Sequence, residues 1–198
     1  MQPTLTRQAF SNREWLFEPK WDGFRAICFL QDGKIRFVSR NRKSLTERFP
    51  DLQGIVKSIK AKCAVLDGEI VALNNKGVPC FDGLRSRRFA AECVIVYYAF
   101  DLIYLDGLDL TQCPLVSRKA TLKKILPKQN TARVRYTDHI VGEGERLFAE
   151  LEKRRLEGMV AKRSDSLYVS GRTRAWLKIK TAAGREEMRK RSAAWRLQ

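Results

Sequence analysis

Short apolar and aromatic runs separated by polar turns recur along most of the chain, and this pattern predicts β-strands. Residues 24–31 and 34–40 flank Asp32-Gly33, a dipeptide that favours the tight turn of a hairpin. The run 94–105 is rich in β-branched and aromatic residues and is followed by a second turn signal, Asp106-Gly107. Further strands are predicted at residues 64–74, 133–137, 158–163 and 175–181.

Apolar residues three or four positions apart predict helices between these strands. In residues 46–59 the apolar positions have helical spacing; Thr46 is the expected capping residue, and Pro50 restricts the first turn. Helices are also predicted at residues 116–126 and 143–154. Strands and helices do not alternate regularly, which favours the α+β class over a doubly wound fold.

The chain length and apolar content suit one compact domain. With 198 residues, 44% of them hydrophobic, the chain can bury a proper core. We place a compact domain at residues 1–181 and a basic tail at 182–198, which could form a short helix. Trp195 is the tail residue that suggests docking; a solvated tail and a nucleic-acid contact are equally supported.

A large positive charge narrows the class of partner. The chain carries 39 Lys and Arg residues against 22 Asp and Glu, a formal net charge of +17 and a sequence pI near 10.1. Such a field attracts polyanions, and nucleic acid is favoured over an acidic membrane. The basic cluster Arg85, Arg87 and Arg88 suits either a DNA contact or a solvated loop.

The sequence also carries signals of cellular location. Its longest purely apolar run, residues 94–100, has seven residues, far fewer than the roughly 20 that a membrane span needs. The five cysteines include no C-x-x-C pair, so reduced thiols are expected. The N-terminus has no apolar segment typical of a signal peptide. We therefore expect a cytoplasmic protein that associates with the nucleoid and not with a membrane.

The candidate chemistry centres on Lys20. There is no P-loop pattern, so a bound nucleotide would be held in another way. Lysine becomes a nucleophile where burial or neighbouring cations lower its pKa. Asp22 could orient the amine, and Gly23 permits close approach of a nucleotide. These positions alone would suit a surface turn equally well.

The segment EPKWDGFRA, residues 18–26, resembles the active-site motif of the ATP-dependent DNA ligases. Five further segments resemble the remaining motifs of that family, in the family's order. They are SRN at 39–41, DGEIV at 67–71, YYAFDLIYLDG at 97–107, EGMVAKR at 157–163 and WLKIK at 176–180. The resemblance covers about residues 14–181 and is greatest to the ligase domain of bacterial end-joining ligases.

This resemblance implies a fold and a reaction. The fold would be a nucleotidyltransferase (ATP-grasp-like) fold of mainly antiparallel sheets flanked by helices. Lys20 would attack the α-phosphate of ATP to give lysyl-AMP; the AMP would pass to a DNA 5′-phosphate, which is then joined to a 3′-hydroxyl. The implied partners are nicked duplex DNA or DNA ends and end-joining accessory proteins, and we expect a monomer.

The resemblance assigns the nucleotide contacts to particular side chains. Glu18 would face the adenine edge, Phe100 and Val160 would sandwich the base, and Arg25 and Arg40 would contact phosphate. Pro19 and Trp21, which flank Lys20, complete that part of the nucleotide-binding set.

The resemblance also assigns the charged groups nearest the reaction. Lys162, Lys178 and Lys180 would gather on the α-phosphate. Glu69 and Glu157 would hold the ribose and a divalent metal, Mg²⁺ or Mn²⁺, because one or two carboxylates plus phosphate oxygens suffice for Mg²⁺. Asp22, Arg25, Lys178 and Lys180 would act with Lys20 in catalysis.

One departure from the family concerns the C-terminal side. Ligases of this family place an OB-fold domain after WLKIK, whereas this sequence ends 18 residues after Lys180, so no C-terminal OB-fold is expected. An excised adenylation domain and a natural variant both fit. On this ground we expect slow self-adenylylation and easier sealing of a pre-adenylylated nick. The competing hypotheses are an RNA ligase, and a non-catalytic DNA-end-binding module with a vestigial nucleotide pocket.

Overall fold

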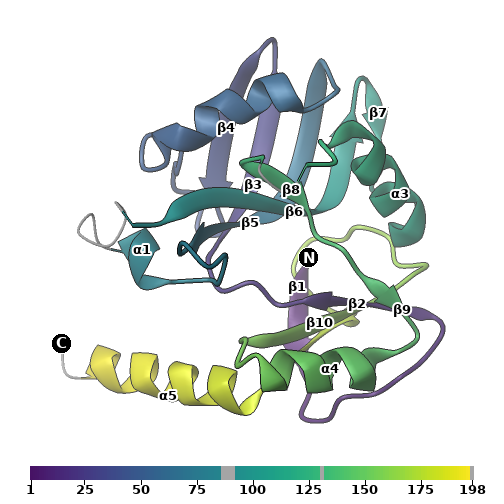
Figure 1. Cartoon of the computed structure of the whole chain (residues 1–198). Helices are drawn as coiled ribbons and strands as arrows, with labels where there is room; N and C mark the ends of the chain where they lie inside the picture. The colour runs from purple at the N-terminus through teal and green to yellow at the C-terminus, as the bar shows by residue number, and fades with distance from the viewer. Residues whose placement is uncertain (86–91, 130–131, 197–198) are drawn as a thin grey trace. The chain divides into compact units, whose positions relative to one another are not determined.

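The computed structural model describes residues 1–85, 92–129 and 132–196, with side chains described up to residue 190. Packing groups the chain into two units (Figure 1). Unit 1 consists of Met1–Trp21 and Asp138–Gln198, and unit 2 of Asp22–Thr137. Arg87 and Arg88 of the predicted basic cluster and the side chain of Trp195 lie outside the described residues. The predicted boundary at residue 181 stays a prediction.

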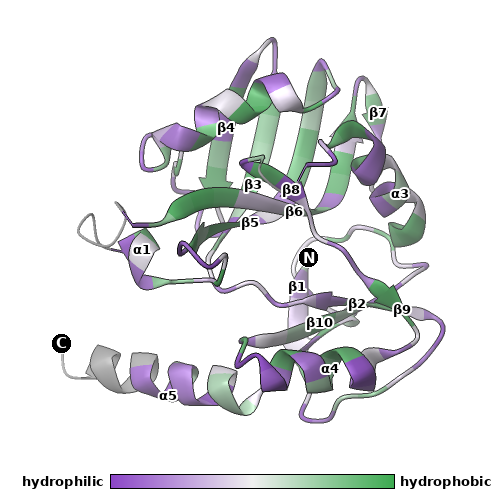
Figure 2. Cartoon of the chain, in the orientation of Figure 1, coloured by the Kyte–Doolittle hydropathy of each residue, from purple (hydrophilic) through white to green (hydrophobic). Residues whose placement is uncertain are grey.

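Unit 1 is built on a five-stranded sheet. Its strands are β1 (Gln2–Leu5), β2 (Trp15–Pro19), β9 (Ile140–Val141), β10 (Gly158–Arg163) and β11 (Arg172–Lys180). Their order is β1-β11-β10-β2-β9; β1 runs parallel to β11, and the other pairs are antiparallel. The helices are α4 (Gly144–Lys153) and α5 (Ala182–Arg196). In Figure 2, α5 is mostly hydrophilic within the part that is coloured.

One face of this sheet is closed by α4. Phe17, Met159, Ala161 and Ile179 are fully buried in a cluster with Leu151 of α4. Successive strand residues point to opposite faces, so the neighbours of these core residues point to the other face. The opposite face therefore carries the polar side chains of β2, β10 and β11, among which Glu18 and Lys162 are buried.

Unit 2 is built on a second, mainly antiparallel sheet. Its strands are β3 (Phe24–Gln31), β4 (Lys34–Ser39), β5 (Cys63–Leu73), β6 (Val94–Leu105), β7 (Leu108–Asp109) and β8 (Val134–Tyr136). The order is β4-β3-β5-β6-β7, and β8 pairs in parallel with β6. The remaining elements are the 3₁₀ helix η1 (Pro50–Ser58), α1 (Asp82–Arg85) and α3 (Leu115–Ile125).

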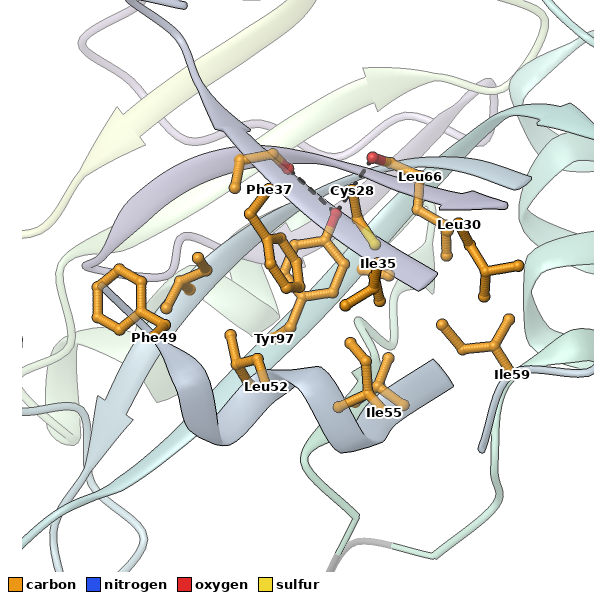
Figure 3. Close-up of a cluster of buried hydrophobic side chains, with 14 of the residues drawn as sticks. Cys28, Leu30, Ile35, Phe37, Phe49, Leu52, Ile55, Ile59, Leu66 and Tyr97 are labelled. Carbon is orange, nitrogen blue, oxygen red and sulfur yellow. Dashed lines mark hydrogen bonds between the residues drawn. The ribbon is translucent and has the colours of Figure 1, made fainter. Parts of the chain in front are cut away.

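The core of unit 2 lies on one face of its sheet, beneath η1 and α3. Figure 3 shows Leu52 and Ile55 of η1 close to Phe37 and Tyr97 of the sheet. The Tyr97 hydroxyl lies 3.0 Å from the carbonyl oxygen of Ala26 and 3.2 Å from that of Leu66. These contacts satisfy a buried hydroxyl and tie β3, β5 and β6 together.

The predicted α+β class and most predicted elements are confirmed, with differences of at most three residues at their ends. The helix predicted at residues 46–59 is wrong in its start and type: η1 begins at Pro50 and is a 3₁₀ helix. Thr46 does not cap it, because its hydroxyl accepts a hydrogen bond from the Phe37 amide at 2.9 Å. In the described part of the chain, no helix is long and apolar enough to cross a membrane.

Candidate functional site

The face of the unit 1 sheet opposite α4 carries predicted residues of β2, β10 and β11. In register, Val160 lies between Glu18 and Lys178, and Lys162 lies opposite Trp176. Lys20 continues the ladder beyond β2, since its amide donates a 2.8 Å hydrogen bond to the Gly158 carbonyl. Strand alternation therefore brings side chains that are far apart in sequence onto one surface.

Lys20 is held by a carboxylate that it shares with a second lysine. Its Nζ donates to Oε2 of Glu157 at 2.5 Å, and Nζ of Lys180 lies 3.2 Å from Oε1 of the same carboxylate. The exposed fractions are 23% for the Lys20 side chain, 11% for Glu157 and 14% for Lys180. The predicted nucleophile is thus accessible but fixed in position by charge-assisted contacts.

Lys178 adds a further positive charge to this surface. Burial lowers its pKa below the usual lysine value, and the nearby cations Lys20, Lys180 and Arg172 lower it further, while Glu157 opposes the shift. A lowered pKa shows that the cationic form is held at a cost in the absence of an anion. An anionic group such as a phosphate would relieve that cost.

The backbone at Glu157 is closely constrained. Gly158, the next residue, has φ of 152°, and a Cβ at this position would lie 2.1 Å from the Ile179 carbonyl oxygen. A side chain at 158 would therefore force β10 away from β11. This explains the glycine of the EGMVAKR segment in physical terms.

Lys162 is engaged with Glu18. Its Nζ lies 2.6 Å from Oε2 of Glu18, and each side chain is 2% exposed. The same ammonium lies 4.1 Å from the ring centroid of Trp176, a cation–π distance. The family resemblance implied a place for Lys162 on the α-phosphate and gave Trp176 no role. The signal in the sequence for a partner of Lys162 was a charged residue two positions after Val160 in a short, mainly apolar strand.

Unit 2 brings together a second group of predicted residues. Arg25 of β3 lies opposite Glu69 of β5, and its guanidinium lies 5.6 Å from the Phe100 ring centroid. The same guanidinium binds both oxygens of Asp67, at 3.0 and 2.5 Å. Asp67 belongs to the DGEIV segment but was missed as a functional residue; its place two residues before Glu69, on the same face of a strand, could have revealed it.

Other predicted residues lie in the connections. Trp21 is the last residue of the first segment of unit 1, and Asp22, half-buried, is the first residue of unit 2. Arg40 is exposed in the turn after β4, where the Ser39 hydroxyl accepts a hydrogen bond from the Lys43 amide at 3.0 Å. Each unit thus contains some of the predicted nucleotide-binding and catalytic residues.

The residues present could supply only some of the ligands that a Mg²⁺ ion needs. Within the described residues, no three His, Cys, Asp or Glu side chains form a metal-binding group. The two predicted metal-binding carboxylates belong to different units, Glu157 to unit 1 and Glu69 to unit 2. That fits the preference of Mg²⁺ for one or two carboxylates together with phosphate oxygens and water.

Comparisons with known proteins agree on one family. The model of the ATP dependent DNA ligase domain matches residues 3–180. The multifunctional non-homologous end joining protein LigD of Mycolicibacterium smegmatis is 32% identical over 172 residues, which cover 86% of this chain and 22% of that protein. The SPbeta prophage-derived DNA ligase-like protein LigB of Bacillus subtilis is 30% identical over 177 residues, covering 87% of this chain and 63% of that protein.

Solved structures confirm the expected fold. The ligase domain of LigD from M. tuberculosis superposes with a TM-score of 0.76 at 31% identity, covering 91% of this chain and 59% of that one. A mycobacterial DNA ligase D complexed with ATP and MES gives the same TM-score. The chain spans about a fifth of the length of the LigD proteins it matches. On the match of residues 3–180, the chain belongs to the family of ATP-dependent DNA ligase domains.

Proposed function

We propose that this chain is the catalytic core of an ATP-dependent DNA ligase and that Lys20 is its covalent nucleophile. The observation that supports this proposal most directly is the Lys20–Glu157–Lys180 cluster, in which one carboxylate contacts both ammonium groups. This cluster lies on the sheet face that also carries Glu18, Val160 and Lys178. A module that only binds DNA would have no need for a partly buried acid that contacts two lysines.

The first step would join Lys20 to AMP. Lys20 Nζ, after losing its proton, forms a bond to the α-phosphorus of ATP, and the bond from that phosphorus to the pyrophosphate oxygen breaks. Lys178 and Lys180 would stabilise the charge on the α-phosphate oxygens. A Mg²⁺ ion held by Glu157 or Glu69 would neutralise phosphate charge. The Lys20 ammonium loses two protons to water as it becomes the N–H of the phosphoramide, the pyrophosphate leaves with the electron pair of the broken P–O bond, and the ion pair of Lys20 with Glu157 is lost.

The remaining roles are proposed from the geometry of each unit. Glu18, fixed by Lys162, would receive the adenine edge, and Val160 would contact the base. Within unit 2, Phe100 would stack on a base, Arg25 would contact phosphate from its anchor on Asp67, and Arg40 would bind the 5′-phosphate of DNA.

The polynucleotide partner is proposed to be DNA with a nick or an end. The net charge of +17 supports a phosphate-backbone partner. The names of the LigD relatives place those proteins in non-homologous end joining. In the two later steps the AMP moves from Lys20 to the DNA 5′-phosphate, and the 3′-hydroxyl then displaces AMP. End-joining accessory proteins and a place at the nucleoid are part of the same proposal.

The test is the covalent adduct. Wild-type protein incubated with ATP and Mg²⁺ is expected to gain the mass of one AMP, and Lys20→Ala is expected to gain none. Lys153→Ala is the matched control, because Lys153 is 73% exposed on α4 and contacts only the exposed Glu150 among the ion pairs described. Wild-type protein that forms no adduct, either as isolated or after incubation, would support the non-catalytic alternative.

A further inference from the structure

The first turn of α5 lies directly against the backbone of Glu157. Thr181, fully buried between β11 and α5, donates from its hydroxyl to the Leu156 carbonyl at 2.5 Å. The Thr181 amide donates to the Glu157 carbonyl at 3.2 Å. The same hydroxyl accepts a hydrogen bond from the Gly184 amide at 3.1 Å, so one side chain caps α5 and binds the peptide that carries Glu157.

Gly184 makes the close approach possible. A Cβ at this position would lie 1.9 Å from the carbonyl oxygen of Glu157 and 2.8 Å from its carbonyl carbon. Both atoms belong to the backbone and cannot rotate away as a side chain would. Any residue other than glycine at 184 must therefore displace either α5 or Glu157.

Two further contacts close the arrangement. The Ala182 amide at the start of α5 donates to Oε1 of Glu152 in α4 at 3.0 Å. From the other side, Gly158 fits directly against the Ile179 carbonyl of β11. The backbone around Glu157 is thus held between α5 and the neighbouring strand, and α4 fixes the start of α5.

These contacts come from a part of the chain that the family comparison does not cover. The family match ends at residue 180, whereas Thr181 and Gly184 follow it. Neither of the roles expected for this segment, a solvated tail or a nucleic-acid contact, explains a fully buried threonine or a glycine in a helix. Both features are explained if this segment positions Glu157.

We propose that Thr181 and Gly184 are positioning residues, which hold the Glu157 carboxylate between Lys20 and Lys180 from the first turn of α5. The inference rests on the proposed function, because Glu157 matters only if Lys20 reacts. A shift of about 1 Å in a catalytic group is enough to cost on the order of 100-fold in rate. The first turn of α5 would therefore be part of the adenylation machinery.

Gly184→Ala separates this role from simple helix stability. Alanine favours a helix interior over glycine by about 1 kcal/mol, so helix propensity alone predicts a variant at least as active as wild type. The contact with Glu157 predicts the opposite. Gly54→Ala is the matched control, because Gly54 lies in η1 with nothing within 4 Å of its added Cβ.

Two measurements on the full chain test the proposal. The first is the rate of lysyl-AMP formation at a series of Mg²⁺ concentrations. Gly184→Ala and Thr181→Val are expected to be slower by about tenfold or more at limiting Mg²⁺, with a higher Mg²⁺ requirement. Thr181→Ser keeps the hydroxyl and is expected to stay close to wild type, as is Gly54→Ala.

The second measurement needs no ATP or metal. Amide hydrogen exchange in residues 154–160 is expected to be faster in Gly184→Ala and Thr181→Val than in wild type and in the Gly54→Ala control. Normal adenylylation and unchanged exchange in both variants would overturn the proposal. If wild type itself forms no adduct, the proposed function fails; the exchange result then still decides whether α5 holds the Glu157 backbone.

Discussion

Positive charge is concentrated around a single carboxylate on the unit 1 face. Glu157 contacts Lys20 and Lys180 directly, and the pKa of Lys178 is lowered first by burial and then by the nearby Lys20 and Lys180. The cationic form of Lys178 is therefore held at a cost in the folded protein. A nucleotide phosphate near Lys178 would stabilise its cationic form. Nucleotide binding would thereby relieve the electrostatic cost that the protein carries without it.

Lys178→Met is expected to stabilise the free protein at neutral pH. The pKa of Lys178 is lowered in the folded state, first by burial and then by neighbouring cations, so the unfolded chain binds its proton more tightly. The destabilisation is complete below the lowered pKa and is relieved as the pH rises through it toward the usual value of 10.5. The advantage of Lys178→Met should therefore shrink as the pH rises from about 7 to about 10.

Urea unfolding at several pH values measures this effect. Lys153→Met, at an exposed position of α4, serves as the control and is expected to change stability little at any pH. An advantage of Lys178→Met that is constant or grows with pH would contradict the assignment. The same variant should form lysyl-AMP more slowly, since it loses a charge from the proposed α-phosphate site.

At the scale of elements, α3 is fixed to β6 by a buried ion pair. Arg118 of α3 binds both oxygens of Asp101 at 2.8 Å and the Cys113 carbonyl at 2.5 Å, and neither side chain of the pair is exposed. Asp101 follows Phe100, the proposed base-stacking residue. The ion pair therefore determines where α3 meets the strand that carries part of the candidate site.

Arg118→Leu is expected to destabilise unit 2 by about 3–5 kcal/mol, because it leaves Asp101 buried without its cation. Arg146→Leu is the control: Arg146 is 79% exposed and its contact with Glu143 contributes little. Chemical denaturation of both variants gives the comparison. A loss below about 1 kcal/mol for Arg118→Leu would show that water or another group replaces the guanidinium.

The elements also show what sequence patterns could and could not predict. The long strands β5 and β6 and the helices α3 and α4 have strong local patterns and were predicted within a few residues. Strands β1, β7 and β9 have two to four residues, too few for a periodic signal, and form only because a neighbouring strand is present. Thr46 was misread as a cap because its partner, the Phe37 amide, lies nine residues earlier in β4, outside the predicted helix.

The candidate site shows the same division between residues that local patterns indicate and contacts that they do not. Lys20, Glu157, Lys178 and Lys180 lie in recognisable segments, so the sequence indicated them. The contacts of Arg25 and Lys162 depend instead on the register between strands. Arg25 binds Asp67, and Lys162 contacts Glu18 and the ring of Trp176. Register is fixed by packing of the whole sheet, and a local pattern does not contain it.

At the scale of the whole molecule, the net charge of +17 should dominate DNA binding. A protein that neutralises Z phosphates loses affinity with a log–log salt slope of about −0.9 Z on duplex DNA. Six such contacts would reduce affinity by about 10³ between 50 and 200 mM salt. Binding of a nicked duplex should therefore depend steeply on salt and weakly on base sequence.

Arg40→Ala tests whether this field acts through particular contacts. If the exposed Arg40 binds one phosphate, its loss should make the salt slope shallower by about 1 and weaken binding similarly for different sequences. Arg146→Ala, which removes the same charge from the exposed surface of α4, should leave the slope unchanged. Fluorescence anisotropy of a labelled nicked duplex at several salt concentrations measures both slopes. Equal slopes for the two variants would assign Arg40 to the general field and remove it from the proposed phosphate contacts.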